Sequence, residues 1–132
     1  MKIAYLDGIR LYRVLYAGIQ SLLDEQDYLN KINVFPVPDG DTGTNMAFTL
    51  MGIIESIQPH SNMALNELSE LVADAALDNA RGNSGVIMAQ FFQGLSVGLK
   101  PFTEVNTTQF AEASKIAVDE SYTALLNPRE GT

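Results

Sequence analysis

The chain has 132 residues, the size of one domain, and 46% of them are hydrophobic, which is enough for a buried core. Sixteen acidic and eight basic residues give a net charge of −8, which argues against binding to nucleic acid or to an anionic membrane, since both need clustered Lys and Arg. The absence of cysteine excludes disulfides, and a single histidine, His60, excludes a histidine-rich metal site.

The sequence shows neither a signal peptide nor a membrane span. The residues before Asp7 lack the apolar stretch of a secretory signal, and no apolar run is long enough to cross a bilayer. We therefore expect a cytoplasmic protein.

Helical periodicity dominates the pattern of apolar residues. From Gly8 to Tyr28 they recur at steps of three and four, which predicts one helix with a buried face. A second helix is expected to start at Thr44 or Asn45 and to end near Ile57. Three more are expected over about 65–79, 86–99 and 107–125. The helix at 86–99 is apolar on nearly every side and should be the most buried.

Local signals support the helix ends and argue against strands. Asn106 is expected to cap the last helix, with the Gln109 side chain bonding back to it, and Asn127-Pro128 should stop that helix. Residues 34–37 alternate like a strand, but the prolines at 36 and 38 argue against one. We predict an all-α fold, an antiparallel bundle of amphipathic helices in a single domain over residues 1–132.

The topology brings the unusual loops together. If successive helices run antiparallel, as short connections favour, every second loop lies at the same end of the bundle. The loops at 33–44, 80–85 and 127–132 then share one end, and those at 58–64 and 100–106 share the other. Helix N-termini at the first end would offer unpaired N–H groups and partial positive charge, which suit phosphate.

The first loop contains a candidate metal site. Asp39 and Asp41 are separated by Gly40, so both carboxylates can point the same way, and such a pair suits Mg²⁺. Asn33 could add a side-chain oxygen from the other limb of the loop. The alternative is that Pro-Asp-Gly is only a turn and that Asp41 caps the following helix.

Two short segments are candidate phosphate sites. Residues 42–45, Thr-Gly-Thr-Asn, combine hydroxyls, an amide and a flexible backbone at a helix start, although the Lys of a P-loop is absent. Residues 81–85, Arg-Gly-Asn-Ser-Gly, could wrap a phosphate beside the Arg81 charge. The alternative in both cases is helix capping, with Ser84 as the cap of the fourth helix.

These motifs resemble a known family. Asn33–Met46 (N-V-F-P-V-P-D-G-D-T-G-T-N-M) and Ala80–Gln90 (A-R-G-N-S-G-V-I-M-A-Q) are similar to the nucleotide-binding (DhaL-type) domain of the dihydroxyacetone kinase family. They are most similar to the N-terminal kinase domain of bacterial fatty acid kinase, and the resemblance covers essentially the whole chain in order.

The resemblance implies a helical barrel that binds ATP or ADP with Mg²⁺ at one rim. By similarity, Asp39 and Asp41 hold magnesium, and Asn33 is carried over with them. The residues implied in phosphate binding are those of the two matching loops, namely Thr42, Gly43, Thr44, Asn45, Gly82, Asn83, Ser84 and Gly85. The family domain is longer, so the chain resembles a C-terminally truncated form. An open barrel would favour self-association or a partner that supplies further helices.

The leading hypothesis is a Mg·ATP-binding kinase domain that phosphorylates a fatty-acid carboxylate presented by a separate carrier protein. One alternative is the nucleotide-holding subunit of a dihydroxyacetone-type kinase, whose acceptor is bound by a partner subunit. Another is a non-catalytic helical interaction domain that keeps the fold. The sequence singles out no catalytic base.

Overall fold

Helices form most of the chain that the structure describes. The computed structural model describes residues 5–35 and 37–124. Its helices are α1 (Gly8–Asp24), α2 (Gln26–Lys31), α3 (Thr42–Ile57), α4 (Leu65–Asp78), α5 (Gly82–Leu99) and α6 (Thr107–Tyr122). Two short strands, β1 (Leu6–Asp7) and β2 (Glu104–Val105), complete the described elements. The predicted all-α class is confirmed.

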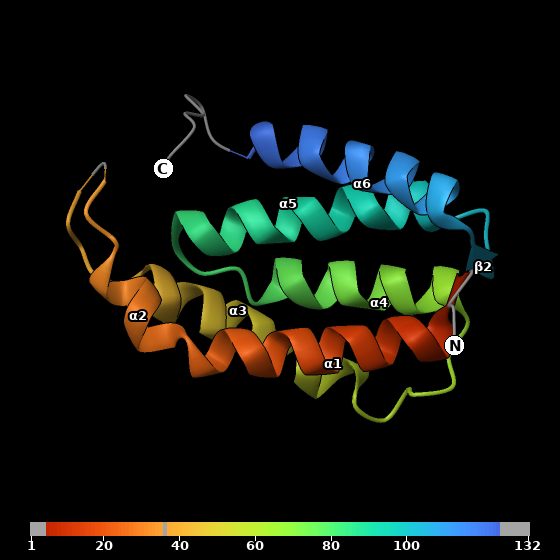
Figure 1. The fold of residues 1–132 in the computed structure, drawn as a ribbon, viewed down its shortest axis with the longest axis horizontal. Coiled ribbons are helices and arrows are strands. Elements are labelled where there is room, and N and C mark those ends of the chain that lie inside the picture. The colour runs from red at the N-terminus through yellow and green to blue at the C-terminus, as the bar shows by residue number, and fades with distance from the viewer. Residues whose placement is uncertain (1–4, 36, 125–132) are drawn as a thin grey trace.

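The long helices form two layers (Figure 1). Helices α1, α4, α5 and α6 lie side by side in that order, and α3 packs behind them against α1, α4 and α5. Successive long helices run antiparallel, as predicted. Figure 1 shows the α2–α3 loop and the α4–α5 turn at one end of the bundle, and the α3–α4 and α5–α6 connections at the other. The predicted helix stop at 127–128 and the third loop, 127–132, lie outside the described residues.

The helix boundaries differ from the predictions in three places. The helix expected over 8–28 is divided at Glu25 into α1 and a six-residue α2. Helix α5 begins at Gly82 rather than Val86, and α3 begins at Thr42 rather than Thr44 or Asn45. Glycine and threonine are poor helix formers in isolation, so tertiary contacts determine where these two helices start.

The predicted cap of the last helix is confirmed. Asn106 Oδ1 accepts the Gln109 N–H at 2.8 Å, and Gln109 Oε1 accepts the Asn106 N–H at 2.9 Å. This capping box satisfies backbone donors that the helix itself leaves unpaired.

The two-stranded sheet was not predicted. β1 pairs antiparallel with β2, with Leu6 opposite Val105 and Asp7 opposite Glu104. Two residues are too few to show a period of two, and the partners lie far apart in sequence. The pairing fastens the start of α1 to the connection between α5 and α6.

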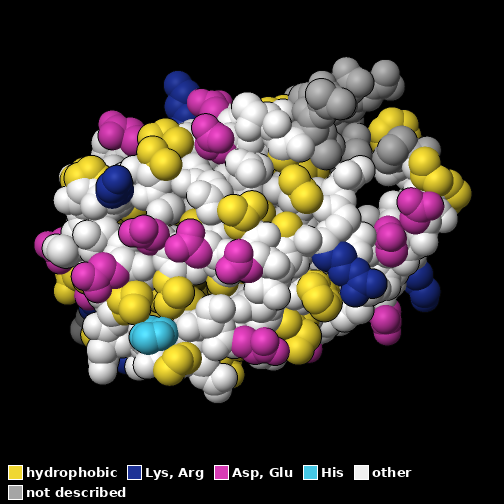
Figure 2. Space-filling model, turned by 180° about the vertical axis from the view of Figure 1, so that it is seen from behind, with side chains coloured by type: hydrophobic (Ala, Val, Ile, Leu, Met, Phe, Trp, Pro, Cys, Tyr) yellow, Lys and Arg dark blue, Asp and Glu magenta, His cyan; other side chains and the backbone are white. Residues whose placement is uncertain are grey.

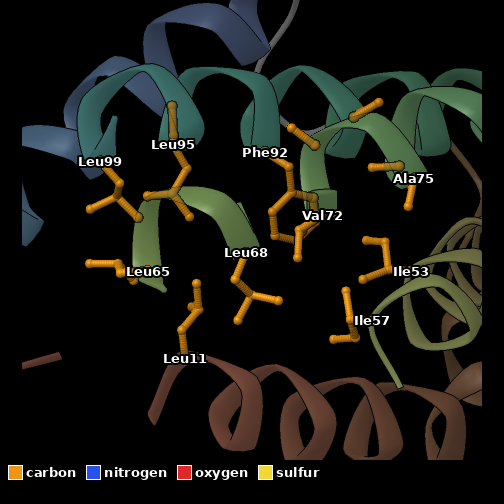
Figure 3. Close-up of a cluster of buried hydrophobic side chains, with 14 of the residues drawn as sticks. Leu11, Ile53, Ile57, Leu65, Leu68, Val72, Ala75, Phe92, Leu95 and Leu99 are labelled. Atoms are coloured by element: carbon orange, nitrogen blue, oxygen red, sulfur yellow. The ribbon is translucent and has the colours of Figure 1, made fainter. Parts of the chain in front are cut away.

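The core lies between the two layers (Figure 3). Side chains from α1, α3, α4 and α5 point toward one another there, and Ile53, Ile57, Leu65, Leu68 and Leu99 are fully buried. The expectation that the helix over 86–99 is the most buried was wrong. Six of the 18 residues of α5 are buried, against eight of the 16 in α3, because α3 contacts α1, α2, α4 and α5 together.

Within the described residues, no helix is long and apolar enough to cross a membrane.

Ile53→Ala should destabilise the fold strongly. The Ile53 side chain is 0% exposed, so its removal leaves a cavity that costs about 2–5 kcal/mol of unfolding free energy. Urea denaturation followed by circular dichroism measures the change. The matched control is Val97→Ala at a position that is 62% exposed, where a loss within about 0.5 kcal/mol is expected. Equal losses in the two variants would contradict this description of the core.

Candidate functional site

Two of the three loops predicted to share one end of the bundle, 33–44 and 80–85, meet in one pocket there. Its volume is about 330 Å³, and it lies between the α2–α3 loop, the start of α3 and the start of α5. The pocket is lined by Asn33, Phe35, Val37, Asp39, Asp41, Thr42, Asn45, Gly82, Asn83, Ser84 and Ile87. Eight of the eleven predicted site residues are among them; Gly43, Thr44 and Gly85 are not.

Asn33 closes the α2–α3 loop. Its Oδ1 accepts the N–H of Asp41 at 3.0 Å and that of Thr42 at 3.2 Å, so one side chain joins the two limbs of the loop. Gly40, which separates Asp39 from Asp41, adopts a φ of +67°, a conformation that residues with a side chain rarely take. The loop thereby turns sharply with Asp39 and Asp41 on either side of the glycine.

Within the described residues, both loop carboxylates are free of side-chain partners. Asp41 occupies the N-cap position of α3, yet its side chain makes no capping hydrogen bond. Neither Asp39 nor Asp41 forms a salt bridge or a side-chain hydrogen bond within the described residues. Both are exposed and line the pocket. Two unpaired carboxylates one residue apart are therefore available to a ligand.

The part of the chain that the structure describes holds no group of three or more His, Cys, Asp or Glu side chains that could enclose a metal ion. A cation at Asp39 and Asp41 would have two carboxylates from the protein, so the remaining ligands must come from elsewhere. Mg²⁺ is commonly bound in this way, with phosphate oxygens and water completing its coordination.

Helix α2 holds the start of α3 in place. The Thr44 N–H donates to Asn30 Oδ1 at 3.0 Å, and the Thr44 hydroxyl accepts from Asn30 Nδ2 at 3.0 Å. A Cβ on Gly43 would overlap the backbone carbonyl of Gln26. Gly43 and Thr44 therefore face α2 rather than the pocket. Sequence reasoning missed Asn30 and Gln26, because their partners are 14 to 18 residues away and no local pattern marks them.

The start of α5 lies directly against α3. Gly82 has a φ of +66°, and a Cβ there would overlap the Asn45 side chain; a Cβ on Gly85 would overlap the Thr49 hydroxyl. That hydroxyl accepts the Arg81 N–H at 3.2 Å and donates to the Asn45 carbonyl at 2.9 Å. Gly85 therefore allows α5 to pack closely against α3, whereas Gly82 lines the pocket.

The first N–H groups of α5 are unpaired within residues 5–35 and 37–124. No described group accepts the N–H of Gly82, Asn83 or Ser84. The alternative in which Ser84 caps this helix does not hold, since Arg81 occupies the N-cap position without a side-chain bond. Unpaired N–H groups at a helix start carry the positive end of the helix dipole. Gly82, Asn83 and Ser84 line the same pocket as the two carboxylates.

Arg81 does not line the pocket. Its guanidinium lies over the Phe48 ring, 5.0 Å from the ring centre, which is a cation–π arrangement. Its charge is therefore not part of the pocket wall, where the partial positive charge is that of the N–H groups at the start of α5.

The fold is all-α, and two carboxylates and the start of α5, none of them paired within the described residues, line one pocket at its end. A family model described as the DAK2 domain matches residues 36–132. The chain belongs to the DAK2-domain family, whose domains bind nucleotide.

Several bacterial proteins are similar to almost the whole chain. It is 39% identical over 130 residues to an uncharacterized protein of Staphylococcus saprophyticus, and 37% identical over 132 residues to Protein YloV of Bacillus subtilis. An uncharacterized protein of Staphylococcus haemolyticus is 36% identical over 130 residues. Each alignment covers 98–100% of this chain and 24% of the relative, so the chain spans about a quarter of the length of these relatives.

Asn30→Ala should destabilise the protein through the start of α3. The variant leaves the N–H of Thr44 without its partner, which costs about 1–3 kcal/mol of unfolding free energy. Chemical denaturation measures the change. Asn83→Ala is the matched control, because the Asn83 side chain is exposed and has no hydrogen bond within the described residues, and its effect should stay within about 0.5 kcal/mol. A larger loss in the control than in Asn30→Ala would rule out this role for Asn30.

Proposed function

We propose that the chain is a Mg·ATP-binding kinase domain. The observation that carries the proposal is the meeting, in one pocket, of the free Asp39 and Asp41 carboxylates with the unpaired N–H groups at the start of α5. Membership of the DAK2-domain family supports nucleotide as the ligand. Residues 1–132 are proposed to form one domain, since the described helices share one core.

The donor set at the α2–α3 loop fits magnesium. Asp39 and Asp41 supply hard oxygen ligands, and their carboxylates are not used for capping or ion pairing within the described residues. Asn33 Oδ1 already accepts two backbone N–H groups, so its part is to hold the loop shape rather than to provide a third strong ligand. When bound, the metal would offset the charge of phosphate oxygens.

Phosphate is proposed to bind mainly at the start of α5. Two N–H groups in the first turn of α3, those of Thr42 and Thr44, are occupied by asparagine side chains. Those of Gly82, Asn83 and Ser84 have no partner among the described residues. Phosphate oxygens accept hydrogen bonds from such groups and gain from the helix dipole. Of the residues predicted to bind phosphate, we therefore retain Gly82, Asn83 and Ser84 for that role. Thr42 and Asn45 form part of the pocket wall.

The proposed reaction is phosphoryl transfer. An acceptor oxygen forms a bond to the γ-phosphorus while the bond to the bridging oxygen breaks, and ADP leaves. The chain's own residues position the phosphates and stabilise the spreading negative charge through the N–H groups of α5. On the basis of the loop sequences, the proposed acceptor is a fatty-acid carboxylate presented by a separate carrier protein.

ATP with Mg²⁺ should raise the melting temperature of the 132-residue chain. Ligand at about 100 times its dissociation constant adds roughly 2.7 kcal/mol, which corresponds to at least about 5 °C for a domain of this size. Differential scanning fluorimetry with ATP, with and without Mg²⁺, measures the shift. Asp39→Asn and Asp41→Asn should abolish the part of the melting-temperature shift that depends on Mg²⁺.

Asp74→Asn is the control for these variants, because Asp74 is exposed on α4 and lies outside the pocket. It should keep the full shift. A shift that persists unchanged in the Asp39 and Asp41 variants would mean that nucleotide binds elsewhere. No shift in the folded wild type would overturn the proposal.

A further inference from the structure

The chain contains the dipeptide Asp-Gly twice, at Asp7–Gly8 and at Asp39–Gly40. In this dipeptide the main-chain nitrogen of glycine can attack the aspartyl side chain, because glycine has no side chain that hinders the approach or restricts the backbone. The attack leads to isoaspartate, in which the main chain runs through the aspartyl side chain. Whether it occurs in a folded protein depends on the surroundings of the pair, and the two pairs differ in them.

The first pair is held at the start of α1. Asp7 is the N-cap, and its Oδ1 accepts the Arg10 main-chain N–H at 2.9 Å while its Oδ2 accepts Arg10 Nη1 at 2.9 Å. Gly8 is buried, and a Cβ there would overlap the Met63 carbonyl. Because both carboxylate oxygens are bonded and the glycine is enclosed, the start of the helix must open before the two groups can react.

The second pair is exposed on the α2–α3 loop, which Figure 2 shows projecting from the body of the molecule. The Asp39 carboxylate has no side-chain partner within the described residues. The N–H groups on either side of Gly40 are bonded, that of Asp39 to the Val37 carbonyl at 2.8 Å and that of Asp41 to Asn33 Oδ1 at 3.0 Å. The Gly40 N–H between them has no acceptor in the part of the chain that the structure describes. Neither reacting group is therefore held by another part of the protein.

We propose that Asp39–Gly40 is a site of spontaneous isoaspartate formation. The Gly40 nitrogen forms a bond to the side-chain carboxyl carbon of Asp39, and one carboxyl oxygen leaves as water with the amide proton and the carboxyl proton. Water then opens the resulting succinimide ring. When it breaks the bond between the Asp39 main-chain carbonyl and the nitrogen, the chain stays joined through the side-chain carbonyl. One water leaves and one returns, so the mass is unchanged and no other reactant is needed.

The modification would change the candidate metal site. Isoaspartate lengthens the main chain by one carbon and shortens the side chain by one, so the carboxylate of residue 39 would no longer keep its position beside Asp41. A cation bound at Asp39 would hold the carboxylate and slow ring closure. This protection rests on the proposed function, whereas isoaspartate formation itself does not.

The test is to age the purified 132-residue chain in neutral buffer at physiological temperature and to follow both Asp-Gly pairs by mass spectrometry. Electron-transfer fragmentation distinguishes isoaspartate from aspartate in the digested peptides. Isoaspartate should form at position 39 at least about tenfold faster than at position 7, since an opening of the α1 start that costs only about 1.4 kcal/mol already lowers the reactive population tenfold.

The urea-unfolded chain is the matched control, because both pairs are exposed there and should react at similar rates. Asp39→Glu should remove the signal at position 39, since glutamate would have to close a larger ring that forms more slowly. Equal rates at positions 7 and 39 in the folded chain would overturn the inference, and so would the absence of isoaspartate at position 39.

Ageing with Mg²⁺ and ATP separates this inference from the proposed function. A slower reaction at position 39 under these conditions would support both. An unchanged rate at position 39 would leave isoaspartate formation established and would count against a metal ion bound at Asp39.

Discussion

The arrangement of the candidate site depends on how closely the start of α5 approaches α3. Gly82 and Gly85 present no side chain to α3, and the space that a Cβ would take is filled by Asn45 and Thr49. The buried Thr49 hydroxyl bonds to the backbone on both sides of this contact, accepting from Arg81 and donating to Asn45. A buried polar group that lost either partner would cost free energy, so the contact has one favourable geometry. The pocket and the positions of its walls follow from it.

The starts of α3 and α5 meet at this contact, and their first backbone N–H groups differ in whether they are hydrogen-bonded. In α3, side chains of Asn30 and Asn33 bond to N–H groups of the first turn, which holds the aspartate loop in shape. In α5, the first three N–H groups have no acceptor among the described residues. A helix N-terminus whose N–H groups are already bonded is held rigidly but cannot bind an anion through those groups. A helix N-terminus with unbonded N–H groups can. The two carboxylates and the start of α5 thus line one pocket.

The charge of the chain bears on why the proposed nucleotide binding would use both the two carboxylates and the unpaired N–H groups of α5. With a net charge of −8, the chain as a whole repels an anionic ligand such as a nucleotide. Arg81 lies over Phe48 and outside the pocket lining, so it adds little positive charge at the pocket itself. In the proposed function, oriented backbone N–H groups at short range and a cation at Asp39 and Asp41 would supply the attraction.

The sequence by itself determined the helical class, the cap at Asn106 and the grouping of the two unusual loops at one end of the bundle. These rest on local interactions within about four residues and on the antiparallel order that short connections impose. Eight of the predicted site residues line the pocket for the same reason. Only the tertiary structure decided that the first helix divides at Glu25, that Asn30 bonds to Thr44, and that Gly43 and Gly85 pack against neighbouring helices. Contacts between residues far apart in sequence leave no periodic or capping pattern, so they become visible only once the helices are packed.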